Sequence, residues 1–495
     1  MRQGSGPLLG VVMTSTEVLL EQIRSGPSGP ATAAVFDFDG TLIDGYSAAA
    51  LYSHRFRNFE IGPGELIRTV RASRGPTLTE EQFVALIEDG LGGWAGRVEE
   101  DALELGERLF AQGIAGTLFH PAWRLVKAHQ RRGHTVVIAT SATRLQVAPL
   151  ARELGVEHVL CTRLATEGGL LTGKVDGRTL WGPGKIAAVR EFAASRGVDL
   201  AASHAYANGD EDVPLLDGVG HPHPVNPQPE LAEEAARRGW PVLRFAPAKS
   251  GQFDPVPALR TAALFGTLFA AAGVGIAVGA LNGDRRQGVD LATSMFGALA
   301  GPLTDIDVQV VGEQHAWSHR PAVFLINHQS TLIDFLVATR VIRTGFTAVA
   351  KREVKQMPVV GPLFDLAGVA FLDRANRAEA LDALKPVVET LRSGTSVVMA
   401  PEGTRSLTPK LGEFKKGAFH LASQAGVPLV PIVIRNAGEL MWRNARTARA
   451  GTVQVVVHPP ISTDGWTRDD IDARVGSVRE LYVDTLENWP TPSST

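Results

Sequence analysis

The sequence predicts an α/β fold, with sheets flanked by helices in each of two large halves. Three observations lead to this prediction. Short apolar runs alternate with amphipathic helical segments along most of the chain, as in strand–helix–strand units. At 495 residues, the chain is too long for one ordinary core and should divide into about two to four domains. The stretch PAKSGQFDPVPAL, which begins at Pro247, has the composition of a linker between domains.

These patterns divide the chain into six consecutive parts. We expect an N-terminal extension at 1–30, a first domain at 31–245, a linker at 246–258, an apolar hairpin at 259–304, a second domain at 305–488 and a tail at 489–495.

In the first half, the run Ala33–Phe38 ends in acidic residues and a Gly-Thr turn. This pattern predicts a buried parallel strand with a functional loop at its carboxyl end. Residues 46–115 have a helical pattern without a convincing strand, and His221–Pro224 (HPHP) is expected to be a proline-rich loop rather than a metal site. Further strands of the same sheet are expected at 135–139, 156–160, 204–207 and 242–245.

The second half opens with an apolar stretch at 261–281 that holds no charge. A helix of ~20 apolar residues is long enough to cross a bilayer, whereas the next run, Leu291–Leu303, is too short to do so alone. The two runs could form a re-entrant hairpin, a buried core hairpin or an anchor in the membrane interface, and we favour the anchor. Gly275 and Gly279 form a GxxxG pair within the first run. Strands are expected to follow at 308–311, 322–326, 395–399 and 429–434.

Composition excludes several classes of function. The net charge of −3 argues against a nucleic-acid-binding protein. The single cysteine, Cys161, excludes an intramolecular disulfide framework and a zinc cluster built from cysteines.

The segment VFDFDGTL, at 35–42, carries the chemistry of the first half. Successive strand residues point to opposite faces, so Asp37 and Asp39 project the same way. One carboxylate can attack phosphorus, while the other donates a proton to the leaving oxygen and later activates water. Gly40 and Thr41 form a tight turn that exposes backbone N–H groups to phosphate. The segment therefore predicts phosphoryl transfer through an aspartyl-phosphate.

With these motifs, residues 31–245 resemble the haloacid dehalogenase superfamily, specifically its phosphoserine-phosphatase-like branch. The resemblance implies a Rossmann-like fold in which residues 46–115 form a helical cap that selects a small phosphomonoester. It also implies that Ser141 in VVIATSAT and Lys185 in GPGKIAAV bind the phosphate.

The same resemblance implies a Mg²⁺ site formed by Asp37, the carbonyl of Asp39 and the loop YANGDEDVPLL. In this loop, Asp212 aligns with the second acid of the family motif and Asn208 with the first. A neutral amide binds Mg²⁺ more weakly than a carboxylate, and Asp210 could take the metal instead. The acidic run could also be a solvated turn.

The second half has its own catalytic pattern in NHQSTLID, at 327–334. Asn327 and His328 follow a predicted strand, and imidazole is a suitable base near neutral pH. A carboxylate on the other ring nitrogen, here Asp334, would fix the tautomer. Five residues separate His328 from Asp334, a spacing that fits a pair if His328 lies in the loop before a helix.

Further motifs follow in order: GVAFLDR at 368–374, EGTRS at 402–406 and VPIVI at 430–434. Together with NHQSTLID they resemble the glycerolipid acyltransferase family, which makes phosphatidic acid from 1-acylglycerol-3-phosphate, over residues 305–460. The resemblance implies that Arg374 and Arg405 bind the acceptor phosphate, in agreement with the bidentate geometry of guanidinium. The other residues implied in substrate binding are Phe371, Glu402, Gly403 and Thr404.

The two resemblances together imply a bifunctional enzyme at the cytoplasmic face of the cell membrane, peripheral or monotopic. Its partners would be a membrane lipid, acyl-CoA or acyl carrier protein, and a small phosphomonoester, without nucleic acid. Two alternatives remain open. The first half could be an inactive or phosphate-sensing module, as Asn208 would suggest, and the acceptor could be another one, such as glycerol-3-phosphate.

Overall fold

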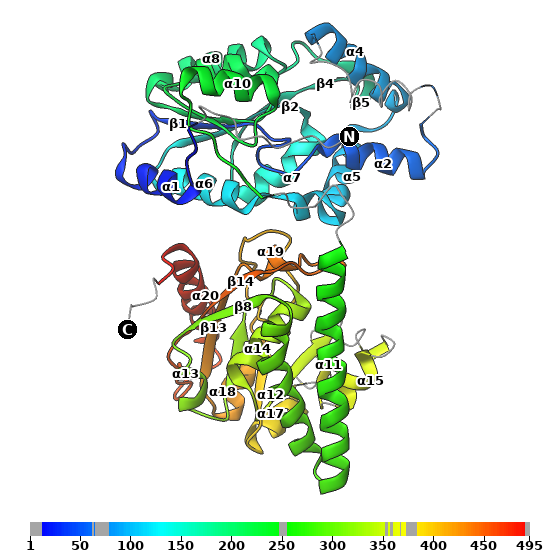
Figure 1. Ribbon diagram of the computed structural model, residues 1–495, viewed down its shortest axis with the longest axis vertical. Helices are drawn as coiled ribbons and strands as arrows, with labels where there is room; N and C mark the ends of the chain where they lie inside the picture. Colours follow the sequence, from blue (N-terminus) through cyan, green and yellow to red (C-terminus); the bar gives the residue numbers. More distant parts are fainter. Residues whose placement is uncertain are drawn as a thin grey trace. The chain divides into compact units, whose positions relative to one another are not determined.

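The computed structural model describes residues 12–61, 64, 79–246, 255–351, 355–356, 360–366, 368–372 and 384–490. The chain forms two compact units, Met1–Gly251 and Gln252–Thr495, which divide within the segment that the sequence assigns to a linker. Both units are α/β, so the predicted fold class is confirmed (Figure 1).

The first unit is built around a five-stranded parallel sheet with the strand order β3-β2-β1-β6-β7. Its central strand β1 is buried along its whole length, which explains its continuous apolar sequence. The strands are β1 (Ala33–Phe36), β2 (Thr135–Thr143), β3 (His158–Thr162), β6 (His204–Ala207) and β7 (His221–Pro224).

Helices cover both faces of this sheet. One face of β1, β2 and β6 packs in an apolar cluster with α8, α9 and α10. The other face meets α6, where the ring of Phe36 contacts that of His129, and α6 packs on α1. The helices are α1 (Thr16–Ser25), α6 (His120–Arg131), α7 (Arg144–Leu154), α8 (Pro183–Arg196), α9 (Val213–Asp217) and α10 (Pro229–Arg238).

The segment predicted as a cap contains α2 (Ser47–Arg57), α4 (Glu80–Leu91) and α5 (Glu99–Gln112) in its described part. An antiparallel hairpin that the sequence did not predict, β4 (Leu164–Glu167) with β5 (Leu170–Val175), packs against α4. The segment predicted as a cap is therefore helical in its described part, and a hairpin from outside it packs against α4.

Two predictions for this sheet were wrong. His221–Pro224 is not a loop but the edge strand β7, which pairs in parallel with β6. Proline is tolerated there because an edge strand has a free side on which no N–H is needed. Residues 242–245, predicted as a strand, make only isolated bridges, from Val242 to Met13 and from Leu243 to Val225.

The second unit contains a seven-stranded sheet with the order β11-β10-β12-β9-β13-β14-β8. Its neighbouring strands are parallel except for β13 and β14, which are antiparallel. Of its strands, β10, β11 and β14 were not predicted. The strands are β8 (Ile306–Val311), β9 (Val323–Ile326), β10 (Phe346–Lys351), β11 (Ala370–Leu372), β12 (Ser396–Met399), β13 (Leu429–Arg435) and β14 (Gly451–Val457).

Two long antiparallel helices, α11 (Pro255–Asn282) and α12 (Arg285–Leu303), form the predicted apolar hairpin. Their backbones approach so closely that a Cβ on Gly275 would lie 2.4 Å from the carbonyl oxygen of Gly288. The remaining helices are α13 (His315–Ser318), α14 (Thr331–Ile342), α15 (Val360–Leu366), α17 (Lys385–Arg392), α18 (Gly417–Ala425), α19 (Ala437–Leu440) and α20 (Ile471–Glu487).

Helix α11 is long and apolar enough to cross a membrane, with a mean hydropathy of 2.0 in its most apolar window and only 22% of that window buried. This exposure does not fit the alternative of a buried core hairpin. Only one narrow face of α11 is buried, and large apolar side chains are exposed on the rest of the hairpin. They are Val256, Leu259, Phe265, Phe269, Val274, Ile276, Leu281, Leu299 and Leu303.

A proline interrupts the hydrogen-bond ladder in the middle of this sheet. Pro431 of β13 lies opposite Leu325 of β9 and has no N–H to donate. The hydroxyl of Tyr482, from α20, fills the gap. It donates to the carbonyl of Leu325 over 2.6 Å and accepts from the N–H of Ile432 over 3.1 Å. Helix α20 is thus part of the hydrogen bonding of the central sheet.

Replacing Tyr482 with Phe should destabilise the second unit by about 1–3 kcal/mol, because a buried carbonyl and a buried N–H would lose their partner while ring packing is kept. Hydrogen exchange of peptides from β9 and β13 during urea unfolding measures the change. The exposed Tyr46, replaced with Phe, is the matched control. Equal stability of the two variants would show that the hydroxyl adds nothing.

Five histidines gather beside β6 and β7, and we call them the histidine layer: His129, His134, His204, His221 and His223. Nε2 of His134 donates to the carbonyl of Pro27 over 2.9 Å, so a neutral His134 accepts at Nδ1 from Nδ1 of His129 over 2.8 Å. Nε2 of His129 then accepts from the Tyr206 hydroxyl over 2.8 Å. Burial lowers the pKa of His204 to about 3 and holds the pKa values of His129 and His223 well below 6.5.

The histidine layer should make the first unit sensitive to acid. Unfolding returns the imidazoles of His129, His204 and His223 to a pKa of about 6.5, so the unfolded chain binds more protons and stability falls as the pH drops below that value. We expect amide protection in β6 and β7 to fall from about pH 7 to about pH 5. A His204→Asn variant should show a shallower decline. Protection that is constant or that rises over this range would contradict the assignment of neutral histidines.

Candidate active sites

Asp37 follows the last residue of β1, at the carboxyl end of the central strand. Its backbone N–H donates to the carbonyl of Tyr206 on β6, which continues the ladder for one more residue. Gly40 then turns the chain with a φ of +76°, where a Cβ would lie 2.2 Å from the amide nitrogen of Asn208. The predicted turn therefore requires glycine both for its φ and for its contact with the loop that follows β6.

Lys185, in the first turn of α8, lies between two carboxylates. Its Nζ is 2.9 Å from Oδ1 of Asp37 and 2.6 Å from Oδ1 of Asp212, and all three side chains are buried. Burial alone would lower the pKa of Lys185, but the two carboxylates raise it above its usual value, so the lysine stays charged. Burial raises the pKa of Asp37 to about 6 against the attraction of the ammonium group.

The side chain of Asp39 is hydrogen-bonded to Ser47, the first residue of α2. Its carboxylate accepts from the backbone N–H of Ser47 over 2.7 Å and from the Ser47 hydroxyl over 3.1 Å. Gln146 of α7 donates in turn to the Ser47 hydroxyl over 2.8 Å. Burial raises the pKa of Asp39 to about 7. A carboxyl group with that pKa can give up and take back a proton near neutrality.

Ser141 lies near the carboxyl end of β2, the strand next to β1, where the pairing of β2 with β3 becomes irregular. Its carbonyl accepts from the Thr162 hydroxyl over 2.7 Å, and the residue is half-buried. The structure therefore places Ser141 at the same edge of the sheet as Asp37, as expected for neighbouring parallel strands.

The predicted metal ligands do not all lie at the same place. Oδ1 of Asp210 accepts from the N–H of Leu231 over 2.7 Å, near the beginning of α10. Oδ1 of Asn208 accepts from the Thr41 hydroxyl over 3.2 Å, beside the turn that carries Asp37. Oδ2 of Asp212 is buried without a hydrogen-bond partner. Asn208 and Asp212 are therefore both linked to Asp37, through the Thr41 hydroxyl and through Lys185, whereas Asp210 is engaged elsewhere.

A divalent cation fits this oxygen set. The unpaired buried Oδ2 of Asp212 and the carboxylate of Asp37 are ligands that Mg²⁺ prefers, and the amide oxygen of Asn208 is a weaker one. Within the described ranges, no three His, Cys, Asp or Glu side chains are grouped to hold a metal. The set contains only two carboxylates, because Asn208 aligns with the first acid of the family motif.

Glu211 is an acidic residue beside this site that the sequence did not single out. Burial and the charge of the neighbouring Asp212 together raise its pKa to about 7, against the attraction of Lys185. The acidic run Asp210–Asp212 was the only signal in the sequence, and a solvated turn would give the same signal.

In the second unit, His328 lies in the loop between β9 and α14, and Asp334 lies in the first turn of α14. Nδ1 of His328 is 2.7 Å from Oδ2 of Asp334, which also accepts from the N–H groups of Gln329 and Ser330 over 2.9 Å each. The five-residue spacing is therefore accommodated by the loop. Because Asp334 only accepts, Nδ1 of a neutral His328 carries the proton and Nε2 is unprotonated.

Burial raises the pKa of Asp334, against the hydrogen bonds from His328 and the two backbone N–H groups. Asn327 anchors the other side of the loop to β13. Its side chain donates to the carbonyl of Ile434 over 2.8 Å and accepts from the Ile434 N–H over 2.7 Å. The imidazole is thus held in a fixed orientation from both sides.

Glu402 holds the EGTRS loop against the histidine loop. Its carboxylate accepts from the N–H of His328 over 2.7 Å, from the N–H of Gly412 over 2.8 Å and from the Ser406 hydroxyl over 3.0 Å. The N–H of Ser406 donates back to the carbonyl of His328 over 2.9 Å. With these contacts, the carboxylate positions the loops, which differs from the substrate contact implied by the resemblance.

Arg405 is half-buried and is joined to Arg443 by two hydrogen bonds. Its Nη1 donates to the carbonyl of Arg443 over 2.5 Å, and Nη1 of Arg443 donates to the carbonyl of Arg405 over 2.9 Å. Burial lowers the pKa of Arg405, and the charge of Arg443 lowers it further. Arg443 lies outside the recognised motifs, and no pattern in the sequence pointed to it.

The other predicted residues of this site are only partly described. Gly403 has a φ of +76°, and Thr404 is exposed beside Arg405. Phe371 lies in β11 with the Nζ of Lys355 5.5 Å from its ring centre. Arg374 lies outside the described residues.

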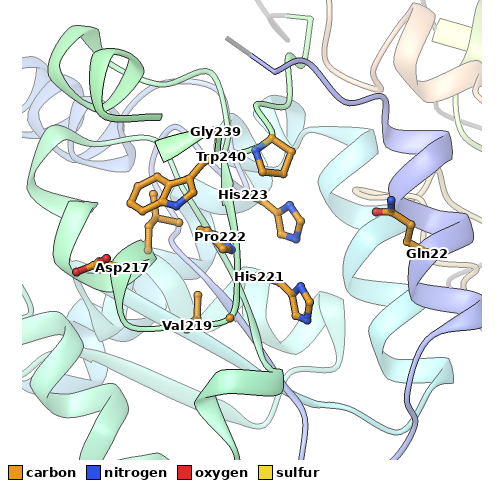
Figure 2. A pocket seen from close by; sticks show the side chains of 11 residues that line it. Gln22, Asp217, Val219, His221, Pro222, His223, Gly239 and Trp240 are labelled. Carbon is orange, nitrogen blue, oxygen red and sulfur yellow. The ribbon is translucent and has the colours of Figure 1, made fainter. Parts of the chain in front are cut away.

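A separate cavity of about 380 Å³ lies beside β7 and is not formed by any of the predicted residues. Figure 2 shows His221 and His223 in it, with Trp240 and Gln22 nearby. The rings of His204 and His221 are stacked with their centres 4.6 Å apart, so they do not converge on a common point as metal ligands would.

Two family models match the chain in separate regions. Residues 34–217 match haloacid dehalogenase-like hydrolases, and residues 307–435 match the acyltransferase family. The first match contains Asp37, Asp39, Lys185 and Asp212, and the second contains the His328–Asp334 pair and Arg405.

Similar proteins include two named 1-acyl-sn-glycerol-3-phosphate acyltransferase. The one from Saccharomyces cerevisiae is 40% identical over 188 residues, which are 37% of this chain and 61% of the yeast protein. The one from Limnanthes alba is 36% identical over 195 residues, which are 39% of this chain and 68% of the plant protein. The inhibition of morphological differentiation protein of Streptomyces azureus is 34% identical over 260 residues, which are 50% of this chain and 92% of that protein.

The motifs, the geometry around them and the two family matches agree. The chain belongs to the acyltransferase family through its second unit, and its first unit matches the model of haloacid dehalogenase-like hydrolases over residues 34–217.

Proposed function

We propose that the second unit transfers an acyl group from acyl-CoA to 1-acylglycerol-3-phosphate and so forms phosphatidic acid in phospholipid biosynthesis. The observation that carries the proposal is the His328–Asp334 pair, whose hydrogen bond at Nδ1 makes Nε2 the nitrogen at which a neutral imidazole can accept a proton. The names of the yeast and plant relatives support the choice of acceptor. Acyl carrier protein, which also presents a thioester, is an alternative donor, and glycerol-3-phosphate is an alternative acceptor.

In this reaction, Nε2 of His328 takes the proton of the acceptor hydroxyl as the oxygen attacks the thioester carbonyl. Asp334 stabilises the imidazolium that forms. When the tetrahedral intermediate collapses, the carbon–sulfur bond breaks and the thiolate takes the proton from His328, which leaves an ester and a free thiol. Arg405 would hold the acceptor phosphate, because guanidinium groups bind phosphate through paired hydrogen bonds.

The lipid acceptor requires contact with a membrane, and we propose the α11–α12 hairpin as a monotopic anchor on its cytoplasmic face. The exposed apolar side chains of α11 support this role. Nε of Arg260, near the start of α11, donates to the carbonyl of Thr304, just after α12, over 2.7 Å. The chain therefore enters and leaves the hairpin at the same end, as a monotopic element requires.

Replacing His328 with Ala should lower acyl transfer by about 10²–10⁴-fold, because the base that accepts the hydroxyl proton is lost. The measurement is acyl-CoA-dependent formation of phosphatidic acid by detergent-solubilised protein. The exposed His319, replaced with Ala, is the matched control. Equal rates in the two variants would exclude His328 as the base. If the unaltered chain transfers the acyl group only to glycerol-3-phosphate, the proposed acceptor, 1-acylglycerol-3-phosphate, is wrong.

We propose that the first unit hydrolyses a small phosphomonoester, with phosphoserine as one candidate. Asp37 would attack phosphorus to form an aspartyl-phosphate while Asp39 protonates the leaving oxygen. Asp39 would then take a proton from water, which attacks phosphorus, releases phosphate and restores Asp37. The pKa of Asp39, raised by burial to about 7, suits both proton transfers, and charged Lys185 suits the binding of phosphate.

Asp37, Asp212 and Asn208 would hold Mg²⁺ together with the carbonyl of Asp39. When bound, the ion would neutralise charge on the phosphate oxygens. Asn208 favours a second function for the first unit, in which the unit binds a phosphorylated compound without hydrolysing it. The reason is that an amide oxygen adds no negative charge to the metal site.

Asp37→Asn should reduce phosphate release to background, because the nucleophile is removed while its size is kept. Phosphate release from a panel of phosphomonoesters, with Mg²⁺ present, is the measurement. Asp210→Asn is the matched control, because its side-chain oxygen can still accept from Leu231. If the unaltered chain is as inactive as Asp37→Asn across the panel, the first unit is not a phosphatase. That result would support the alternative that the unit binds a phosphorylated compound without hydrolysing it.

A further inference from the structure

Two loops of the second unit are joined through a pair of arginines. Arg405 and Arg443 each donate from Nη1 to the carbonyl of the other, over 2.5 Å and 2.9 Å. The indole Nε1 of Trp442 adds a third link, to the carbonyl of Leu407, over 2.9 Å. The loop that follows α19 is therefore fixed against the EGTRS loop.

The positive charge of the arginine pair is not balanced by an ion pair with any described Asp or Glu. Nε of Arg443 is also buried without a hydrogen-bond partner. Two half-buried guanidinium groups repel each other, and a buried donor without an acceptor is costly. An anion between the two groups would offset the repulsion of their charges.

The arginine pair lies next to the proposed base. Ser406, the residue after Arg405, donates its backbone N–H to the carbonyl of His328 over 2.9 Å. The charge of Asp334 also acts on Arg405. An anion bound here would therefore belong to a molecule that is already close to His328.

We propose that Arg443 forms, with Arg405, a clamp for the phosphate monoester group of the acceptor, and so determines specificity for phosphorylated acceptors. The inference rests on the proposed acyltransferase function and adds a residue from outside its recognised motifs. A phosphate dianion matches two guanidinium groups in charge and offers enough oxygens for paired hydrogen bonds. The phosphates of acyl-CoA have the same chemistry, so the test must separate donor from acceptor.

The test compares Arg443→Gln, Arg443→Lys and, as a matched control in the same loop, Arg446→Gln. All carry Asp37→Asn, so that the first unit does not consume the acceptor. Acyl transfer is measured to 1-acylglycerol-3-phosphate and to 1-acylglycerol, which lacks the phosphate. Arg443→Gln should lower kcat/KM for the phosphorylated acceptor by about 10- to 100-fold, as expected for the loss of a charge-assisted contact.

This loss should arise mainly from a higher KM for the acceptor, with the KM for acyl-CoA and the rate with 1-acylglycerol little changed. Arg443→Lys should fall between Arg443→Gln and the parent, and Arg446→Gln should match the parent. An equal loss with both acceptors would overturn the inference, because it would leave Arg443 only as a link between loops. A rise in the KM for acyl-CoA alone would also overturn it, and would assign the pair to the donor.

The inference can fail separately from the proposed function. If the parent acylates no phosphorylated acceptor, the proposed function fails. Hydrogen exchange in residues 401–408 and 441–446 on addition of 1-acylglycerol-3-phosphate then tests the clamp alone. Protection in the parent that is lost in Arg443→Gln would support the clamp, and no protection in the parent would overturn it.

Discussion

Lys185 is buried between Asp37 and Asp212, and the geometry of the candidate active site in the first unit depends on these two ion pairs. A carboxylate at the buried end of a strand is unstable unless a positive charge or several donors neutralise it. Lys185 provides the charge, and its position in the first turn of α8 joins the loop after β1 to the loop after β6. The same pairing leaves Oδ2 of Asp212 without a partner, so the site keeps one oxygen for a further cation.

The second unit meets the same requirement without a lysine. Asp334 is surrounded by one imidazole and two backbone N–H groups, which are neutral donors that a loop can supply. Since these donors come from consecutive residues, the path of the loop determines the orientation of His328. Glu402 then joins this loop to the next one. Both centres lie where parallel strands end, because loops from neighbouring strands meet there.

The motifs could be read from the sequence because each one combines a strand with the loop that follows it. Asp37, Asp39, His328 and Asp334 were predicted in this way, and the loop before α14 accommodates the five residues between the last two. Contacts between distant segments gave no such signal. Arg443 and Tyr482 act through loops and helices far along the chain, and neither belongs to a local pattern.

Strand prediction failed for related reasons. The strand β7 contains two prolines, which usually mark loops, and only its place at the edge of the sheet makes them acceptable. The hairpin β4–β5 is mostly polar or half-exposed, so it lacks the apolar run by which buried strands are recognised.

The contacts of Glu402 and Asp210 could not be predicted either, because residue type alone does not indicate their hydrogen bonds.

The hydroxyl of Tyr482 has a consequence for the order in which the protein matures during synthesis. The ribosome makes the first unit completely before the second begins, so its sheet can form while the chain is still growing. The sheet of the second unit has a gap at Pro431 that is closed only from α20. A nascent chain that already contains His328 and Arg405 therefore still lacks a hydrogen bond beneath them. Acyl transfer should begin only after translation has passed residue 482, whereas the first unit need not wait for it.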